Sequence, residues 1–184
     1  MIREKGAHFY DLAYWLTASE PIDVFASGAC LIDPRLSEYG DVDTAALIIR
    51  FENNALATFQ FGRRSGFGHD ELVEVCGAEG MLRGGRKLSG SVEWHRGREI
   101  VGMGIDTDSY KQFSASYVDE LNVFARAVAG QGTVHASLVD GLRAQAVAEA
   151  ALVSIAQSKA VPINRVWSVS YTHLRAHETD SYLV

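Results

Sequence analysis

The stretch DTAALIIRFENNALATFQFGRR, residues 43–64, decides the fold of this chain. Its two halves are rich in β-branched and aromatic residues, and apolar side chains alternate along them, which is typical of half-buried strands. Asn53 and Asn54 stand between the halves, and asparagine tolerates the positive φ that a tight two-residue turn requires. The stretch therefore predicts an antiparallel hairpin.

Further strands are predicted on both sides of this hairpin. IDVFASGACLI precedes it as a single strand, and ELVEVCG and GMLRGG follow it as a second hairpin. SVEWHRG and EIVGMG predict a third, weaker pair. The predicted strands thus gather in one continuous part of the chain.

Helical patterns stand before and after the strands. Residues 6–17 place apolar side chains at helical spacing. Two longer helices follow the strands, and each carries a capping-box pattern, Ser116 with Asp119 and Ser137 with Asp140. Their expected buried faces consist of Val118, Leu121, Phe124, Ala125 and Val128 in the first helix and Leu138, Leu142, Val147, Ala151, Leu152 and Ile155 in the second. This order predicts an α+β fold, an open and mainly antiparallel sheet with helices packed on one face.

The composition argues against several classes of partner. The formal net charge of the 184 residues is −6, whereas nucleic acids and anionic membranes require a concentrated basic surface. The sequence contains no run of 18 apolar residues and no signal peptide, so we expect a cytoplasmic protein. Cys30 and Cys76 lie in apolar runs, and we expect buried thiols rather than a disulfide or a zinc site.

The first helix carries the leading candidate site. Glu4, His8 and Asp11 are spaced by four and three residues, which places their side chains on neighbouring turns of one helix face. A histidine can pass a proton near neutral pH, and a carboxylate beside it can orient the ring or bind a substrate hydroxyl. From spacing alone, a solvated polar helix face is the favoured interpretation, and part of a metal site, which would need further converging ligands, is also open.

A second candidate lies in the glycine-rich segment GFGHDE, which leads into a strand. His69 and Asp70 stand where a loop meets the sheet, and active-site residues often occupy such loops. On composition alone, a turn with a chance histidine is the favoured interpretation.

Two features are set aside. His173 and His177 have the spacing of a metal pair, but they lie in residues 168–184, which match no pattern of the domain and resemble translated adapter sequence. We expect this tail to be non-native. No G-x-G-x-x-G motif follows a strand, so the sequence itself predicts no dinucleotide site.

The stretch REKGAHFYDLAYWLT resembles the start of the second domain of the Gfo/Idh/MocA oxidoreductases, the family of glucose–fructose oxidoreductase and inositol dehydrogenase. The likeness covers nearly all of residues 1–167 and continues, in family order, through FENNALATFQFGRR, GHDELVEVCGAEGML, ASYVDELNVFARAV and SLVDGLRAQAVAEAALVSIAQSKAVPI. It implies a two-domain enzyme whose Rossmann domain, absent from this sequence, holds NAD or NADP and a catalytic lysine. Such enzymes move a hydride between the nicotinamide and a secondary alcohol of a sugar or cyclitol.

The resemblance also implies roles for individual residues. His8 matches the catalytic histidine that takes or gives the hydroxyl proton, and Glu4 matches an aspartate that positions substrate hydroxyls and polarises this histidine. Because glutamate is one methylene longer, its grip on the substrate is expected to differ. Asp11 matches a third polar residue of the helix, and His69 stands where many members carry an aromatic or polar residue that faces the substrate.

We therefore expect residues 1–167 to form the substrate-binding and oligomerisation domain of an NAD(P)-dependent sugar or inositol dehydrogenase, inactive without its cofactor domain. The expected partners are a sugar or cyclitol substrate and further copies of the chain, in a dimer or tetramer formed through the sheet face. Two alternatives stay open. One is a non-catalytic sugar-binding or oligomerisation module of the same fold, and the other is a small metal protein that uses Glu4, His8, Asp11 and His69.

Overall fold

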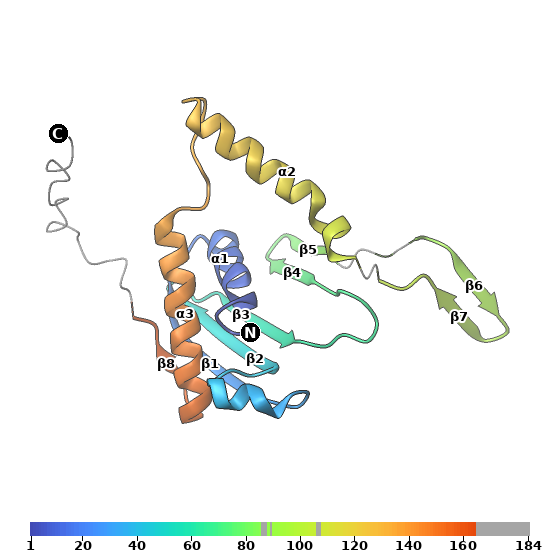
Figure 1. The fold of residues 1–184 in the computed structure, drawn as a ribbon, viewed down its shortest axis with the longest axis horizontal. Coiled ribbons are helices and arrows are strands. Elements are labelled where there is room, and N and C mark those ends of the chain that lie inside the picture. Colours follow the sequence, from blue (N-terminus) through green and yellow to red (C-terminus); the bar gives the residue numbers. More distant parts are fainter. Residues whose placement is uncertain (86–87, 89, 106–107, 165–184) are drawn as a thin grey trace, which may run out of the picture.

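The computed structural model describes residues 1–85, 88, 90–105 and 108–164 (Figure 1). Its elements follow the predicted order, with one helix first, the strands next and two long helices after them. The predicted non-native tail at residues 168–184, with its two histidines, lies outside the described residues.

The predicted hairpin is the centre of a four-stranded sheet with the order β3-β2-β1-β8. β2 (Thr44–Phe51) and β3 (Leu56–Gly62) pair antiparallel, and Asn54 has a positive φ of 66° between them. β1 (Pro21–Ala29) pairs antiparallel with β2 on one side and with the short β8 (Val161–Pro162) on the other. The hairpin prediction is therefore confirmed, but the predicted two-residue turn is wrong: the Phe51 N–H donates to the Ala55 carbonyl at 3.0 Å, which leaves residues 52–54 in the turn.

Two helices, α1 (Lys5–Thr17) and α3 (Leu138–Gln157), cover one face of this sheet. Side chains along β2 alternate between buried and exposed, so one face forms the core and the other is open. The largest fully buried apolar side chains of the core are Phe51, Ile2, Leu47, Ile49, Val24 and Val147. The prediction of an α+β fold with helices on one sheet face is confirmed.

A buried carboxylate anchors the connection between β1 and β2, which contains the 3₁₀ helix η1 (Pro34–Tyr39). Asp43 accepts hydrogen bonds from the backbone N–H groups of Leu31 (2.9 Å), Ile32 (2.8 Å) and Asp33 (2.9 Å). Burial acts to raise the pKa of Asp43, but these bonds outweigh it and lower the pKa to about 2. The ionised carboxylate therefore holds this loop against the sheet.

The predicted cap of α3 is confirmed. The Ser137 hydroxyl accepts from the Asp140 backbone N–H at 3.4 Å, and the Asp140 carboxylate accepts from the Ser137 N–H at 2.7 Å. Val147 and Ala151 are buried as predicted, and Leu142, Leu152 and Ile155 are half-buried. Leu138 is 82% exposed, contrary to the prediction, because it is the first residue of the helix and lies beyond the sheet.

The predicted start of α2 is wrong. This helix runs over Ser109–Val128, and the Asp108 carboxylate caps it by accepting from the N–H groups of Tyr110 (3.0 Å) and Lys111 (3.3 Å). Ser116 and Asp119 lie inside the helix, where their spacing is that of any residues one turn apart. A capping-box pattern alone therefore did not locate the helix terminus.

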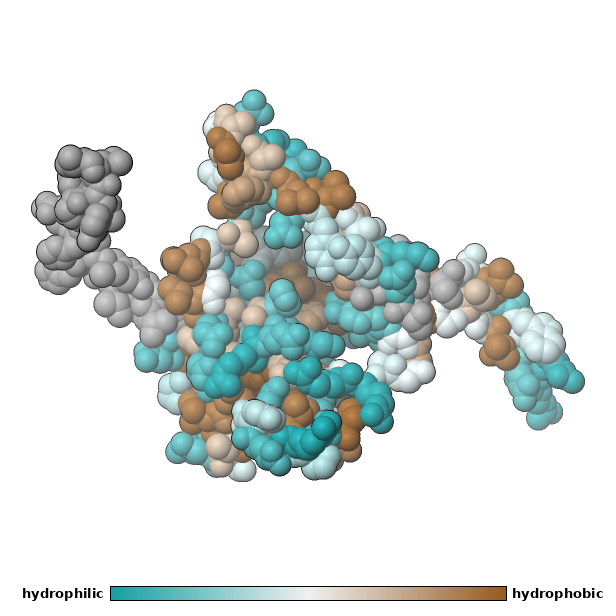
Figure 2. Space-filling view, in the orientation of Figure 1, coloured by the Kyte–Doolittle hydropathy of each residue, from teal (hydrophilic) through white to brown (hydrophobic). Residues whose placement is uncertain are grey.

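The predicted buried face of α2 is also exposed. The exposed fractions are 58% for Val118, 69% for Leu121, 60% for Phe124 and 74% for Val128, and Ala125 is exposed as well. The helix extends away from the sheet (Figure 1), and brown apolar residues show along it in Figure 2. The apolar stripe exists, but no part of the main core lies against it.

Two further hairpins lie outside the main sheet. β4 (Leu72–Gly77) pairs with β5 (Gly80–Gly85), and β6 (Glu93–Arg96) pairs with β7 (Glu99–Gly102), as predicted. Their side chains are largely exposed, which overturns the predicted burial of Cys76 on β4. Cys30 is half-buried rather than buried as predicted, and both thiols are free. Within the described ranges, none of the helices has the length and apolar character needed to cross a membrane.

Candidate active site

Glu4, His8 and Asp11 lie at the start of α1. Glu4 occupies the N-cap position but makes no capping hydrogen bond, and its side chain is 70% exposed. His8 is also exposed, whereas Asp11 is half-buried and faces α3. Burial and the nearby Asp140 raise the pKa of Asp11, while Arg143 and His8 oppose the rise. His8 and Asp11 therefore interact electrostatically.

The Glu4 carboxylate meets an arginine that follows β3. Nη2 of Arg63 lies 3.4 Å from Oε2 of Glu4 and 3.3 Å from Oδ2 of Asp41. The backbone N–H of Arg63 also donates to the Asp43 carbonyl at 2.9 Å, so the loop that Asp43 anchors supports this arginine. The contact joins residues 59 positions apart, and no local sequence pattern indicates it.

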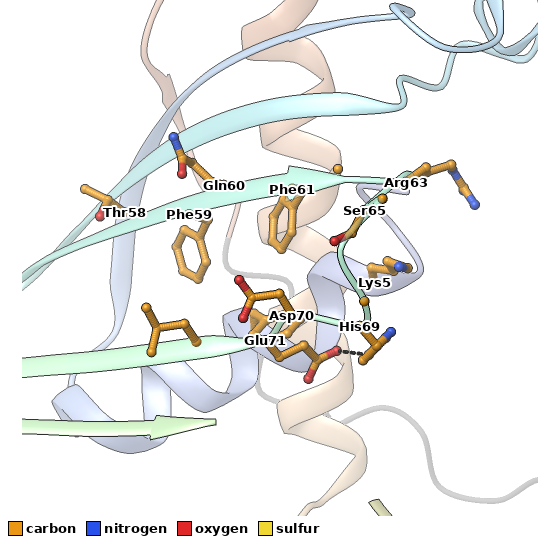
Figure 3. A pocket seen from close by; sticks show the side chains of 15 residues that line it. Lys5, Thr58, Phe59, Gln60, Phe61, Arg63, Ser65, His69, Asp70 and Glu71 are labelled. Atoms are coloured by element: carbon orange, nitrogen blue, oxygen red, sulfur yellow. Dashed lines mark hydrogen bonds and ion pairs between the residues drawn. The ribbon is translucent and has the colours of Figure 1, made fainter. Parts of the chain in front are cut away.

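A cavity of about 460 Å³ opens between α1, β3 and the segment that leads into β4 (Figure 3). Phe9 and Phe61 contact each other with ring centroids 5.8 Å apart, and Phe59 stacks on Phe61 at 5.9 Å. The polar side chains of its wall are Lys5, Thr58, Gln60, Arg63, Ser65, His69, Asp70 and Glu71. Its size and its combination of aromatic surface with convergent polar groups are typical of a small-molecule site.

His69 lies on the wall of this cavity. Its Nε2 is 3.0 Å from Oε1 of Glu71, and its ring meets Phe113 edge-on with centroids 5.8 Å apart. Gly68, just before it, has φ of +125°, and a Cβ atom there would lie 2.8 Å from the Ile105 carbonyl oxygen. Only glycine permits this conformation and this close approach, so Gly68 helps to direct His69 into the cavity.

The structure brings some of the predicted residues together and leaves others apart. His69 and Asp70 line the cavity, and Glu4 adjoins it through Arg63, whereas His8 and Asp11 do not line it. Sequence reasoning missed Lys5 and Arg63, because the fold alone brings the start of α1 against the end of β3.

In the described part of the chain, no three or more His, Cys, Asp or Glu side chains are grouped so as to hold a metal, so the metal-protein alternative gains no support there.

A buried arginine fixes α1 on α3. The Arg143 side chain is 7% exposed, and it donates to Glu20 at 3.0 Å and to Asp140 at 2.7 Å. Its guanidinium carbon also lies 3.5 Å from the ring centroid of Tyr14 on α1. These contacts set the orientation of the helix that carries Glu4 and His8.

Comparisons with known proteins agree with this architecture. Residues 1–83 match the sequence profile described as the GFO/IDH/MocA C-terminal domain. The chain is 28% identical over 163 residues to inositol 2-dehydrogenase of Rhizobium meliloti (strain 1021), covering 89% of this chain and 49% of that protein. It is 39% identical over 75 residues to scyllo-inositol 2-dehydrogenase (NAD(+)) of Bacillus subtilis (strain 168), covering 41% of this chain and 22% of that protein.

A solved structure shows the same fold. The crystal structure of a myo-inositol dehydrogenase from Corynebacterium glutamicum ATCC 13032 aligns with a TM-score of 0.80 at 25% identity, covering 89% of this chain and 49% of that one. Residues 1–83 match the Gfo/Idh/MocA C-terminal domain family, and the fold over 89% of the chain is shared with this myo-inositol dehydrogenase, as the sequence resemblance implied. The chain spans about half the length of the curated relatives it matches.

Proposed function

We propose that residues 1–167 are the substrate-binding domain of an NAD(P)-dependent oxidoreductase, which moves a hydride between the nicotinamide and a secondary alcohol of a sugar or inositol. The observation that carries the proposal is α1, which presents Glu4 and His8 to solvent near a polar-walled cavity of about 460 Å³. The similarity to proteins named as inositol dehydrogenases supports the choice of substrate.

In this proposal His8 is the acid–base residue. Removing a hydride from a carbinol carbon leaves a carbonyl only if the hydroxyl proton also departs, so a base within hydrogen-bond reach is required. Bound NAD or NADP supplies the redox chemistry. His8 is exposed, so a substrate can approach its ring, and the interacting carboxylate of Asp11 stabilises the imidazolium that forms.

Glu4 binds and orients the substrate in this proposal. Its carboxylate can accept a hydrogen bond from a hydroxyl next to the reacting carbon, and Arg63 restricts where its longer side chain can place the oxygens. His69 and Asp70, on the cavity wall, offer further partners for ring hydroxyls. Phe9, Phe59 and Phe61 offer an apolar surface for the C–H face of the ring.

The described residues do not themselves fit a dinucleotide. A Rossmann site needs a parallel strand followed by a glycine-rich turn at a helix N-terminus, whereas every strand pairing in the described part is antiparallel. NAD or NADP would therefore be held mainly by an N-terminal domain outside this sequence, and we assign no residue of this chain to it.

The test joins residues 1–167 to an intact cofactor domain of a related dehydrogenase. Reduction of NAD(P)⁺ is expected only when a sugar or cyclitol such as myo-inositol is present, and the 184-residue chain alone is expected to show no turnover. A joined protein that folds and binds NAD⁺ but oxidises none of a panel of sugars and cyclitols would contradict the proposal. That result would favour the non-catalytic module of the same fold.

We further propose that copies of this chain associate through the open face of the sheet. Phe25 on β1 pairs with Ile48 on β2, and these side chains are 43% and 46% exposed, with Leu56 of β3 at 67%. Apolar side chains grouped on an open sheet face are typical of a protein interface. Light scattering is expected to show a dimer or tetramer that Ile48→Asp converts to a monomer, and a variant that keeps the same mass would contradict this interface.

A further inference from the structure

Arg63 and His69 on the cavity wall already have carboxylate partners within the chain. Arg63 pairs with Glu4 and Asp41, and Nε2 of His69 lies 3.0 Å from Oε1 of Glu71. The Lys5 ammonium differs, because no ion-pair partner for it exists among the described residues. Lys5 is half-buried and lines the cavity, so its charge stands beside a space that a ligand can enter.

Lys5 and Asp70 place a positive and a negative group in different regions of the cavity. Lys5 comes from the first turn of α1 and projects toward the loop that carries Ser65 and His69 (Figure 3). Asp70 extends from the same loop toward Phe59 and Phe61. The cavity thus offers an ammonium and a hydroxyl in one region and a carboxylate against an aromatic surface in another.

A ligand that satisfies both regions has a defined chemistry. A partly desolvated ammonium gains most from an anion, because a charge-assisted hydrogen bond is shorter and stronger than one to a neutral oxygen. Asp70, by contrast, accepts from hydroxyl groups and repels an anion. Resting on the proposed function, we propose that the polyol substrate carries an anionic substituent, a carboxylate or a phosphate, that Lys5 binds while its hydroxyls face Asp70.

This assignment makes Lys5 a residue that determines substrate specificity. It differs from the roles of His8 and Glu4, since it concerns a part of the substrate remote from the reacting carbon. Lys5 directly follows Glu4 at the start of α1. The Glu4 carboxylate would therefore bind a hydroxyl next to the reacting carbon, while the Lys5 ammonium binds the acidic group of the same substrate.

The experiment measures ligand binding to the 184-residue chain by NMR titration at low ionic strength. The probes are D-glucuronate, myo-inositol 1-phosphate, myo-inositol and inorganic phosphate. We expect one of the two acidic polyols to bind about tenfold more tightly than myo-inositol, the difference expected when a charged acceptor replaces a neutral one. The acidic polyol that binds more tightly identifies the substituent as a carboxylate or as a phosphate.

Variants connect the effect to Lys5. Lys5→Gln is expected to raise the Kd of the preferred acidic polyol about tenfold and to leave that of myo-inositol within about twofold, whereas Lys5→Arg retains the preference. Lys159→Gln is the matched control, because Lys159 is exposed and lies outside the cavity wall. An unchanged amide spectrum in each variant excludes loss of the fold.

Several outcomes would overturn the proposal. For the parent chain, these are equal affinity for myo-inositol and both acidic polyols, or no measurable binding of either acidic polyol. For Lys5→Gln, the contradicting result is an equal loss of affinity for neutral and acidic polyols. Inorganic phosphate that binds as tightly as myo-inositol 1-phosphate would also overturn it. Failure here is distinguishable from failure of the proposed function. A joined enzyme that oxidises neutral cyclitols would keep the function and remove only the acidic substituent.

Discussion

The chain contains a packed part and a projecting part that carry similar sequence patterns. In the packed part, formed by α1, β1, β2, β3 and α3, Leu47, Ile49 and Phe51 are each 1% exposed. In the projecting part, formed by β4, β5, β6, β7 and α2, the strands β5, β6 and β7 are exposed along their whole length, and the apolar stripe of α2 is exposed too. Amphipathic patterns thus predict which residues share a face, whereas the tertiary arrangement decides whether that face is covered.

The largest effect is expected from the matched substitutions Phe51→Ala and Phe124→Ala. Phe51 is 1% exposed in the core, so its truncation is expected to lower the free energy of unfolding by about 4 kcal/mol. Phe124 is 60% exposed on α2, and its truncation is expected to change that free energy by less than about 0.5 kcal/mol. Urea unfolding measures both, and similar losses at the two positions would remove the distinction between the two parts.

A somewhat smaller effect is expected at the junction of α1 and α3. Arg143→Met leaves the carboxylates of Glu20 and Asp140 without their shared cation, and we expect a loss of about 3 kcal/mol in the free energy of unfolding. Arg126→Met on the exposed α2 is the matched control, with an expected change below about 0.5 kcal/mol. The account of how α1 is oriented fails if Arg143→Met is as stable as the parent chain.

The pH dependence of stability is expected to follow Asp43. Its folded pKa of about 2 lies below its ordinary value of 3.8, so its ionised form stabilises the fold above about pH 4, and this contribution is lost as the pH falls toward 2. Asp43→Asn is expected to have a lower melting temperature than the parent at neutral pH. Below about pH 4, its melting temperature is expected to fall less steeply with pH than that of the parent. Thermal unfolding followed by circular dichroism measures this. A variant with the same acid profile as the parent would show that other carboxylates dominate.

The smallest effect is expected at an exposed ion pair of the packed part. Nε of Arg3 donates to Oε1 of Glu149 at 2.6 Å, but the two side chains are 53% and 49% exposed. Solvent screens such a pair, so Glu149→Gln is expected to change the free energy of unfolding by less than about 0.5 kcal/mol. A loss as large as that of Arg143→Met would mean that exposure does not separate strong from weak ion pairs in this chain.

Local patterns predicted much of the packed part. The hairpin at Asn53 and Asn54, the first helix and the Ser137–Asp140 cap depend on residues within a few positions of one another, and all three are found, although the hairpin turn is longer than the predicted two residues. The start of α2 was missed because a carboxylate one position before the helix, Asp108, supplies the cap rather than Ser116. Its exposed stripe could not be foreseen, since burial depends on what lies beside a helix.

The candidate site likewise contains residues that a local sequence pattern indicates and residues that only the fold brings together. The helical spacing of Glu4, His8 and Asp11 is readable from the sequence, but Glu4 meets Arg63 only after the chain has passed through three strands. The cavity likewise joins Lys5 and Phe9 of α1 with the loop that carries His69. Such long-range contacts carry no local pattern, so Lys5 and Arg63 had to be found in the structure.

The central claim is that the His8 ring transfers the substrate proton. The most direct measurement compares kcat for polyol oxidation by residues 1–167 joined to a cofactor domain, in the parent form and as His8→Ala and His95→Ala. Because a positioned general base contributes about 10²–10⁴-fold, His8→Ala is expected to lose at least about 10²-fold in kcat. The control His95→Ala, whose exposed side chain lies on β6, is expected to keep the parent rate. Equal turnover in His8→Ala and the parent protein would contradict the claim.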